Sequence, residues 1–527
     1  MARIAVYDTT LRDGAQAETV AFSLVDKVAI ARRLDEFGVD YIEGGYPLAN
    51  PKDHAFFEQM RDEPLRRARL VAFGSTRRAN TTCETDRGLQ ALLDAGTEVV
   101  TIVGKSWGLH VTDVLRCSPE DNLAMIRDSV AWLKAQGRTV FYDAEHFFDG
   151  YRDDPDYAMA TLLAAQDAGA DAVVLCDTNG GTLTSRLRET VRAVRPRIAC
   201  SLGIHVHDDA GLAAANSVAA VEEGCDHVQG TLNGIGERCG NADLCVVVPN
   251  LALKLGCQVL VPGAVEHITG LSRYLYSIAN LTPPQRQPYV GHNSFAHKGG
   301  LHVDAMAKNP LTYEHVRPEQ VGNERRILIS ELSGTAAVLS KAHRLDERID
   351  RETGRKILQA VQDLEHEGYE FEAADASFEL LVRQVLGTRK RFFELQGFRV
   401  IVERRGGDRE PISEATVKLA VDGERRLTVG EGDGPVHALD VALRKALEEF
   451  YPQLRQVRLV DYKVRIVNPR AATAARTCVV IESTDDTDVW GTVGVSDNII
   501  EASWQALIDS IEYTLLRAEE AEGRRDA

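Results

Sequence analysis

Two histidines, His205 and His207, lie one residue apart in the segment Gly203–Gly211. Successive side chains of an extended segment point to opposite faces, so both imidazoles project from the same side. Two imidazoles on one face supply half of a metal site. An ordinary pair of polar residues at a strand end has the same spacing, so the choice between them depends on residues elsewhere in the chain.

Asp13 is the best candidate for a third ligand, because it is followed by Gly14, adjoins Arg12 and comes just after a strand-like run. Two neutral imidazoles with one carboxylate and open positions suit a catalytic divalent ion. This mixed donor set favours Mn²⁺, Zn²⁺ or Co²⁺ over Ca²⁺, and Mg²⁺ is also compatible. A substrate with two adjacent oxygens, such as a 2-oxo acid, would fit the open positions.

The elements that must position these residues follow a clear rhythm: short β-branched runs alternate with amphipathic segments over roughly 250 residues. The expected strands are Ile4–Thr9, Tyr41–Tyr46, Leu70–Gly74, Val99–Val103, Thr139–Ala144, Ala172–Asp177, Leu202–Val206 and His227–Thr231. This pattern predicts an α/β fold with an N-terminal (β/α)8 TIM barrel over residues 1–270. A doubly wound open sheet is disfavoured, because no Gly-rich phosphate turn follows the first strand.

Polar side chains collect where the expected strands end, which is where barrels place their active sites. They include Asp13, Glu43, Asp143, Glu145, Asp177, Thr178, Asn179, His205, His207, Asn233 and Asn241. Ordinary solvent-exposed polar residues would not be expected to gather at the same end of nearly every strand. The same end of the barrel is therefore the predicted site of chemistry.

Beyond the barrel, the pattern changes twice. Residues 271–390 are helix-rich and predict linker subdomains that complete the active site. Residues 391–527 alternate strands and helices and predict a C-terminal α+β domain, built from two copies of a small unit. The runs Gly430–Pro435 and Trp490–Val495 precede the two helices; as loops, they could offer backbone N–H groups to a carboxylate or merely shape a turn.

Composition narrows the function classes. The chain has 527 residues and a formal net charge of −18, which argues against nucleic acid or an anionic membrane as a partner. Its nine cysteines show no C-x-x-C spacing and do not form a disulfide framework. The first residues enter a strand pattern without an apolar signal core, and no apolar run reaches about 18 residues. We expect a cytoplasmic protein.

Three separated motifs carry a family resemblance: Asp8–Gly14, His205–Gly211 and Gly234–Asn241. Together with Gly300–Asp304, they resemble the DRE-TIM metallolyases, more narrowly the 2-isopropylmalate, citramalate and homocitrate synthase group. The resemblance covers almost the whole chain. It implies a divalent-metal enzyme that condenses acetyl-CoA with a 2-oxo acid in a Claisen-type reaction, and a C-terminal regulatory domain of the LeuA dimerisation and allosteric type.

Within that group, the stretches Phe141–Tyr151 and Trp490–Trp504 look most like the citramalate synthases, which favours pyruvate as the oxo acid. 2-Isopropylmalate synthase, with 2-oxoisovalerate, is the nearest alternative. Homocitrate synthase would need a cation for a second carboxylate. A hydroxymethylglutaryl-CoA lyase is a weaker fit, because the loop around Cys239 differs. A non-catalytic amino-acid sensor would be expected to lose a ligand or His302.

The resemblance also implies residue roles. The metal would be held by Asp13, His205 and His207, with Asn241 completing or orienting that set, and Arg12 would stabilise the developing oxyanion. The substrate-binding residues would be Thr178, Gln16 and Asp304, and the acid/base residues would be Glu145, His302 and Tyr313. Which of the last three takes the proton from acetyl-CoA is left open.

The resemblance implies a homodimer, in which the middle region of one subunit reaches the barrel of the other. It also implies that isoleucine or leucine binds the C-terminal domain as an effector. No contact residue for that effector can be assigned from the sequence.

Overall fold

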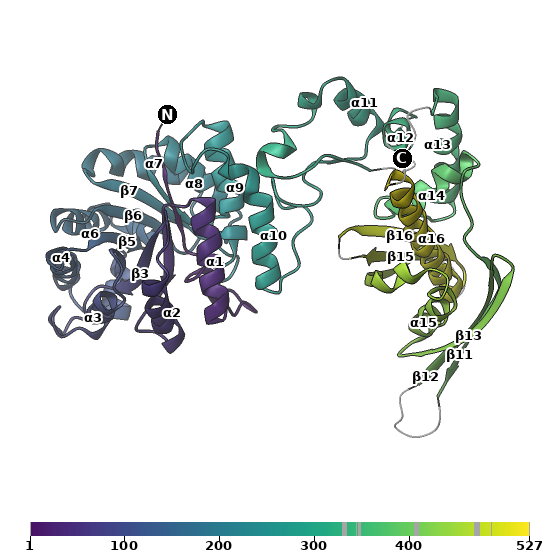
Figure 1. Ribbon diagram of the computed structural model, residues 1–527. Helices are drawn as coiled ribbons and strands as arrows, with labels where there is room; N and C mark the ends of the chain where they lie inside the picture. Colours follow the sequence, from purple (N-terminus) through teal and green to yellow (C-terminus); the bar gives the residue numbers. More distant parts are fainter. Residues whose placement is uncertain are drawn as a thin grey trace. The chain divides into compact units, whose positions relative to one another are not determined.

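The computed structural model describes residues 2–328, 335–343, 345, 349–404, 411–467, 475–485 and 487–525. The chain forms two compact units (Figure 1). The first unit comprises Met1–Phe295 and His315–Arg325, and the second comprises Ala296–Glu314 and Arg326–Ala527.

The first unit is built on a closed barrel of eight parallel strands in chain order (Figure 1). The strands are β1 (Ala5–Asp8), β2 (Tyr41–Gly45), β3 (Arg69–Ser75), β4 (Val99–Lys105), β5 (Thr139–Glu145), β6 (Ala172–Asp177), β7 (Ser201–Val206) and β8 (His227–Gly230). The last strand pairs with the first, so that Val228 lies opposite Val6 and the ring closes. This confirms the predicted TIM barrel and excludes the open doubly wound sheet.

Helices surround the barrel. They are α1 (Leu24–Phe37), α2 (Pro51–Asp62), α3 (Arg87–Asp94), α4 (Pro119–Ala135), α5 (Phe147–Asp153), α6 (Pro155–Asp167), α7 (Thr184–Val194), α8 (Ala213–Glu222), α9 (Leu244–Pro249) and α10 (Ile268–Ile278). Helix α1 shows how the sequence sets their ends: Ser23 and Asp26 form a capping box, and Gly38 ends the helix with a φ of 90°. Its buried Ile30 and Leu34 join the main core, each contributing about 1.5–3 kcal/mol.

A second, smaller apolar cluster fills the barrel with side chains from five strands. It consists of Tyr7, Val71, Val99, Phe141 and Ala172, all almost fully buried. A barrel filled in this way is a packed core rather than a pore. Ligands therefore have access only at the ends of the strands.

The second unit begins with a short strand pair and four helices. The strands are β9 (Ala296–His297) and β10 (Arg326–Ile327); the helices are α11 (Gly300–Lys308), α12 (Thr335–Ala342), α13 (Arg351–His366) and α14 (Asp375–Val385). The predicted helix-rich character of the region after the barrel is therefore confirmed.

The C-terminal part contains two antiparallel three-stranded sheets, each followed by a helix. The first set is β11 (Glu394–Glu403), β12 (Ile412–Val421), β13 (Glu424–Gly432) and α15 (Pro435–Leu447). The second is β14 (Arg458–Ile466), β15 (Thr477–Thr484), β16 (Val489–Ser496) and α16 (Ile499–Arg525). Both sheets follow chain order, as expected for a duplicated unit, and one apolar core joins β12, β15, α15 and α16.

The run Trp490–Val495 lies wholly in strand β16, so the expectation of a loop there was wrong. The run Gly430–Pro435 is divided: Gly430–Gly432 end β13, Asp433 and Gly434 connect it to α15, and Pro435 begins that helix. Their glycines let neighbouring backbone approach closely. A Cβ on Gly430 would lie 2.5 Å from the amide nitrogen of Ala442 in α15. A Cβ on Gly494 would lie 2.1 Å from the carbonyl oxygen of Ala502 in α16. The glycines thus serve helix–strand packing.

All nine cysteines are described and none forms a disulfide. Within the described residues, no helix combines the length and apolarity needed to span a membrane.

Candidate metal and active site

Asp13, His205 and His207 converge at the carboxyl ends of β1 and β7. His205 Nε2 lies 3.3 Å from both His207 Nε2 and Asp13 Oδ2, and His207 Nε2 lies 3.8 Å from the same carboxylate oxygen. A tight turn places Asp13, because its amide and that of Gly14 both donate to the Thr9 carbonyl. All three side chains are buried, and their ligand atoms lie within 4.8 Å of one another. The cluster predicted from the sequence is therefore present.

The donor set fits a divalent cation. Ligand atoms about 2.1 Å from one ion lie about 3.0–3.5 Å from one another, close to the separations in this cluster. Burial acts to raise the pKa of Asp13, but Arg12 and the imidazoles outweigh it and hold that pKa far below its ordinary value. Burial and the neighbouring His205 lower the pKa of His207 to about 4, which leaves a neutral ring able to bind metal.

Asn241 lies beside this cluster. It forms a backbone bridge with His207, and the next residue, Ala242, donates its amide to the Val206 carbonyl at the end of β7. Its Oδ1 atom is buried and has no hydrogen-bond partner among the described residues. A buried acceptor of this kind is costly unless a cation or a water satisfies it, which supports a place for Asn241 near the ion.

Arg12 is held rigidly next to the same cluster. Its Nε donates to Glu43 Oε2 at 2.6 Å, its Nη1 lies 3.5 Å from Asp13 Oδ2, and its guanidinium carbon lies 4.0 Å from the centre of the Phe73 ring. Glu43 is fully buried and also accepts from Tyr7. Burial works against the charge of Arg12, but Glu43 and Asp13 raise its pKa, so the guanidinium stays charged.

Two other predicted residues lie at the ends of neighbouring strands. Glu145 ends β5 and forms an ion pair with Lys105, directly opposite it at the end of β4. The Thr178 hydroxyl, just after β6, accepts from the backbone amide of His146 at 2.9 Å. That leaves its own proton free to donate to a substrate. Gln16 is exposed in the turn after Asp13.

Arg238 joins three of these strand ends, and sequence reasoning assigned it no role. It donates twice to Asp209, at 2.8 and 2.9 Å, and once to the Thr178 carbonyl at 2.7 Å. It does so from a left-handed backbone conformation, with a φ of 56°. The loop from β8 that carries Asn241 is thereby fixed to the residues after β6 and β7.

Comparisons with known proteins identify the family of the chain. A family model described as HMGL-like matches residues 3–272, one for a homocitrate synthase post-HMGL domain matches 289–369, and one for the LeuA allosteric (dimerisation) domain matches 372–515. An (R)-citramalate synthase of Geobacter sulfurreducens is 52% identical over 527 residues, covering 100% of both chains. One of Synechocystis is 54% identical, covering 97% of this chain and 96% of the relative.

The chain belongs to the (R)-citramalate synthase family. A probable 2-isopropylmalate synthase of Methanopyrus kandleri is 31% identical, covering 97% of this chain and 98% of the relative. The identities to the Geobacter and Synechocystis citramalate synthases, 52% and 54%, are much higher over a similar length. The predicted family and its LeuA-type C-terminal domain are confirmed.

The remaining predicted residues of this citramalate synthase family member lie in the second unit. His302 on α11 and Tyr313 stack on each other, with ring centres 4.1 Å apart and planes 27° apart. Both are exposed. Asp304 also lies on α11, but its side chain is outside the part of the chain that the structure describes. The roles of these three residues stay predictions.

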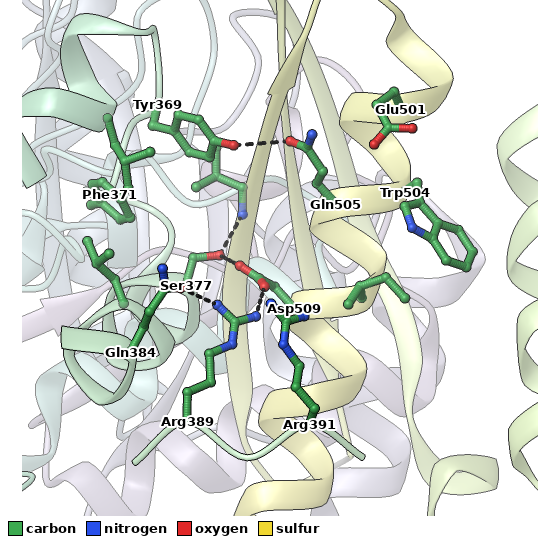
Figure 2. Close-up of a pocket in the computed structure, with 14 residues that line it drawn as sticks. Tyr369, Phe371, Ser377, Gln384, Arg389, Arg391, Glu501, Trp504, Gln505 and Asp509 are labelled. Atoms are coloured by element: carbon green, nitrogen blue, oxygen red, sulfur yellow. Dashed lines mark hydrogen bonds and ion pairs between the residues drawn. The ribbon is translucent and has the colours of Figure 1, made fainter. Parts of the chain in front are cut away.

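The second unit also holds a cavity of about 370 Å³ beside α14 and α16. Figure 2 shows Ser377, Arg389 and Asp509 turned toward one another at one side of it, with Tyr369 and Gln505 paired at the other. Asp509 accepts from Ser377 at 2.7 Å and from Arg389 at 2.8 Å. Tyr369 donates to Gln505 at 3.1 Å. The buried polar groups of this cavity satisfy one another.

Two residues to which sequence reasoning assigned no partner had a detectable signal. Glu43 stands in the buried strand Tyr41–Gly45, and a carboxylate inside an apolar strand requires a cationic partner. Arg238 stands within a motif whose glycines already marked a tight loop. Neither partner could be identified without the three-dimensional register of the strands.

Proposed function

We propose that this chain catalyses the condensation of acetyl-CoA with pyruvate and water to give (R)-citramalate and CoA. The full-length identity of about half to citramalate synthases carries this proposal. The intact arrangement of Asp13, His205, His207 and Arg12 at the barrel mouth supports it. In the reaction, a C–C bond forms between the acetyl methyl carbon and the ketone carbon of pyruvate, and water then cleaves the thioester.

The cluster and Asn241 would hold a divalent ion, for which Mn²⁺, Zn²⁺, Co²⁺ and Mg²⁺ are candidates. When bound, such an ion supplies Lewis-acid polarisation of the pyruvate ketone. Arg12, fixed by Glu43, presents a permanent positive charge to the oxygen that becomes anionic as the new bond forms. Thr178 donates its hydroxyl proton to the pyruvate carboxylate, with Gln16 and Asp304 as further substrate contacts.

Removal of a proton from the acetyl methyl group requires a base near the thioester. Glu145 is the proposed base within the barrel, with His302 and Tyr313 as acid/base partners from the second unit. Glu145 must share or leave its ion pair with Lys105 to reach that proton. Replacement of Glu145 by Gln tests this step: exchange of the acetyl methyl protons with D₂O should stop, and continued exchange would assign the base elsewhere.

The proposed substrate is tested by a free-thiol assay of CoA release with acetyl-CoA, Mn²⁺ and a panel of 2-oxo acids. Turnover is expected with pyruvate. Strong turnover with 2-oxoisovalerate and none with pyruvate would make the chain a 2-isopropylmalate synthase instead. Because one apolar group in a pocket is worth only about 1–3 kcal/mol, a few wall residues decide between these substrates.

The C-terminal part of the second unit, which contains the two three-stranded sheets, is proposed to pair with a second copy of the chain. It exposes apolar side chains along its sheets: Leu427 is 68% and Val429 47% exposed on β13, and Val464 is 44% and Ile466 57% exposed on β14. Each pair lies two residues apart, so its members share one face of a strand. Leu427→Glu combined with Ile466→Glu should convert a dimer to a monomer in light scattering; a dimer unaffected by both would contradict this interface.

The same unit is proposed to bind isoleucine or leucine as an effector, as the LeuA allosteric domain model suggests. Isothermal titration of the full chain with each amino acid tests this. The absence of binding by both would contradict the proposal and would leave the catalytic assignment unaffected.

A further inference from the structure

The metal-ligand candidate His205 has its second ring nitrogen in a buried chain of hydrogen bonds. His205 Nδ1 lies 3.0 Å from Gln229 Oε1, and Gln229 Nε2 donates to Asp143 Oδ1 at 3.1 Å. Gln229 is fully buried, and Asp143 is 3% exposed. The strand register creates this contact, because His205 on β7 lies directly opposite Gln229 on β8.

The order of donors and acceptors along these hydrogen bonds selects one tautomer of the His205 imidazole. Asp143 Oδ1 accepts from the Gln229 amide nitrogen, so the nitrogen side of that amide faces Asp143. The Gln229 carbonyl oxygen then faces His205 Nδ1, which must carry the proton. The lone pair is left on Nε2, the atom that faces Asp13 and His207. A flipped amide would place the proton on Nε2 and block it as a ligand.

His207 has no comparable support. Its Nδ1 is buried without a hydrogen-bond partner among the described residues. Ring orientation at His207 therefore depends on packing, whereas at His205 it depends on two polar side chains. Burial and the Glu43 carboxylate raise the pKa of Asp143 to about 7, while His205 and Arg12 oppose this rise. A cation beyond His205 would add positive charge that favours the ionised carboxylate.

We propose that Gln229, itself held by Asp143, is a positioning residue that fixes His205 in the tautomer able to bind metal through Nε2. This inference rests on the proposed metal site. Partners that orient a ligating histidine typically change metal affinity by about 10–100-fold when they are removed. Neither residue touches the substrate in this account, so their effect should appear first in metal binding.

Three variants of the full chain separate positioning from simple packing. Gln229→Met keeps the side-chain volume but removes the acceptor for Nδ1, and should weaken Mn²⁺ binding by about 10–100-fold. Asp143→Asn removes the group that sets the amide orientation, and should give a smaller loss. The double variant Asp143→Asn with Gln229→Glu restores the series of hydrogen bonds, with the negative charge at position 229 instead of position 143. Its new amide at position 143 donates to the new carboxylate at position 229, and that carboxylate accepts from His205. The double variant should recover most of the affinity.

The readout is Mn²⁺ affinity of the chelator-treated protein, measured by electron paramagnetic resonance of free Mn²⁺, with thermal unfolding as a check on folding. Asn216→Leu is the matched control. Asn216 is equally buried, bonds to Thr182 and Thr184 between α7 and α8, and touches no ligand candidate. It should lose stability without losing affinity.

A folded Gln229→Met variant that binds Mn²⁺ as tightly as the parent would overturn the inference. A double variant that stays as weak as Gln229→Met would also overturn it, because packing alone would then explain the loss. If Gln229→Met does not fold, the comparison of Asp143→Asn with the double variant decides. A parent chain that binds no Mn²⁺ would instead contradict the metal site itself.

Discussion

The barrel mouth and the cavity beside α14 and α16 both bury charged side chains, but they differ in what those groups face. In the cavity, Asp509 accepts from Ser377 and Arg389, so its charge is already matched. At the barrel mouth, two imidazole nitrogens and one carboxylate oxygen crowd together, and Asn241 Oδ1 is left without a partner among the described residues. Arg12 lies 3.5 Å from Asp13, but no donor pairs with the buried Asn241 oxygen among the described residues, and two imidazole nitrogens converge on the same carboxylate. Such a cluster indicates a site for a cation, whereas the paired charges of the cavity indicate a structural role.

The comparison predicts the largest effect at His207. His207→Ala removes one of the converging lone pairs, so Mn²⁺ affinity should fall by more than about 100-fold, since loss of an outer partner alone costs about 10–100-fold. CoA release should become undetectable. Equilibrium dialysis followed by metal analysis measures the first effect, and the thiol assay measures the second.

The control for His207 is His54→Ala, because His54 lies on α2 with half of its side chain exposed. That variant should keep both metal affinity and activity. Full activity in His207→Ala would refute the ligand assignment.

The second prediction concerns Arg389 in the cavity. Arg389→Met should leave Asp509 buried without its cation and Glu512 with Arg391 alone, and cost about 3–5 kcal/mol of unfolding free energy. Urea unfolding with hydrogen–deuterium exchange of α14 and α16 measures this. Mn²⁺ affinity should not change.

Arg455→Met is the matched surface control, since 67% of that side chain is exposed. It should change stability by no more than about 0.5 kcal/mol. If Arg389→Met were equally mild, the distinction between a matched structural network and an open site would fail.

The third prediction concerns Arg12, whose charge is proposed to face the reacting oxygen. Arg12→Lys keeps a positive charge but loses the planar donor set that holds Glu43 and the Phe73 ring. The rate constant kcat should fall by about 10²–10³-fold, as for loss of an oxyanion donor. Mn²⁺ affinity should change little, because Asp13, His205 and His207 remain. A lost metal with an intact kcat for the loaded enzyme would contradict this division of roles.

The smallest effect is expected at Arg238. Arg238→Lys retains one contact with Asp209 but cannot also reach the Thr178 carbonyl in the same geometry. The loss of a charge-assisted hydrogen bond predicts a change of about tenfold in the KM for pyruvate. Steady-state kinetics checks this, and an unchanged KM would show that Thr178 is positioned without Arg238.

Much of the barrel could be predicted because parallel strands buried on both sides read as short apolar runs, and polar residues mark where they end. That is how Asp13, His205 and His207 could be brought together before any coordinates existed. The partners Gln229 and Glu43 could not, because contacts across the barrel depend on strand register and ring closure.

The C-terminal unit was harder to predict in detail. Strands β13 and β16 were missed because glycine normally disfavours strands, and here it is required by helix backbones that pack against Gly430 and Gly494. Sequence patterns indicate which residues are buried and which period they follow, but they do not show which distant segments pack closely together. The same reason prevented a prediction of the Arg389–Asp509 pair, which joins residues 120 positions apart.

The most direct test of this account follows CoA release with acetyl-CoA and pyruvate while the metal is removed and returned. Exhaustive chelation should abolish turnover, and titration with Mn²⁺ should restore it with an end point of one ion per chain. His207→Ala should not recover under the same titration. Undiminished turnover in protein shown by metal analysis to be free of divalent ions would contradict the central claim that Asp13, His205 and His207 form a catalytic metal site.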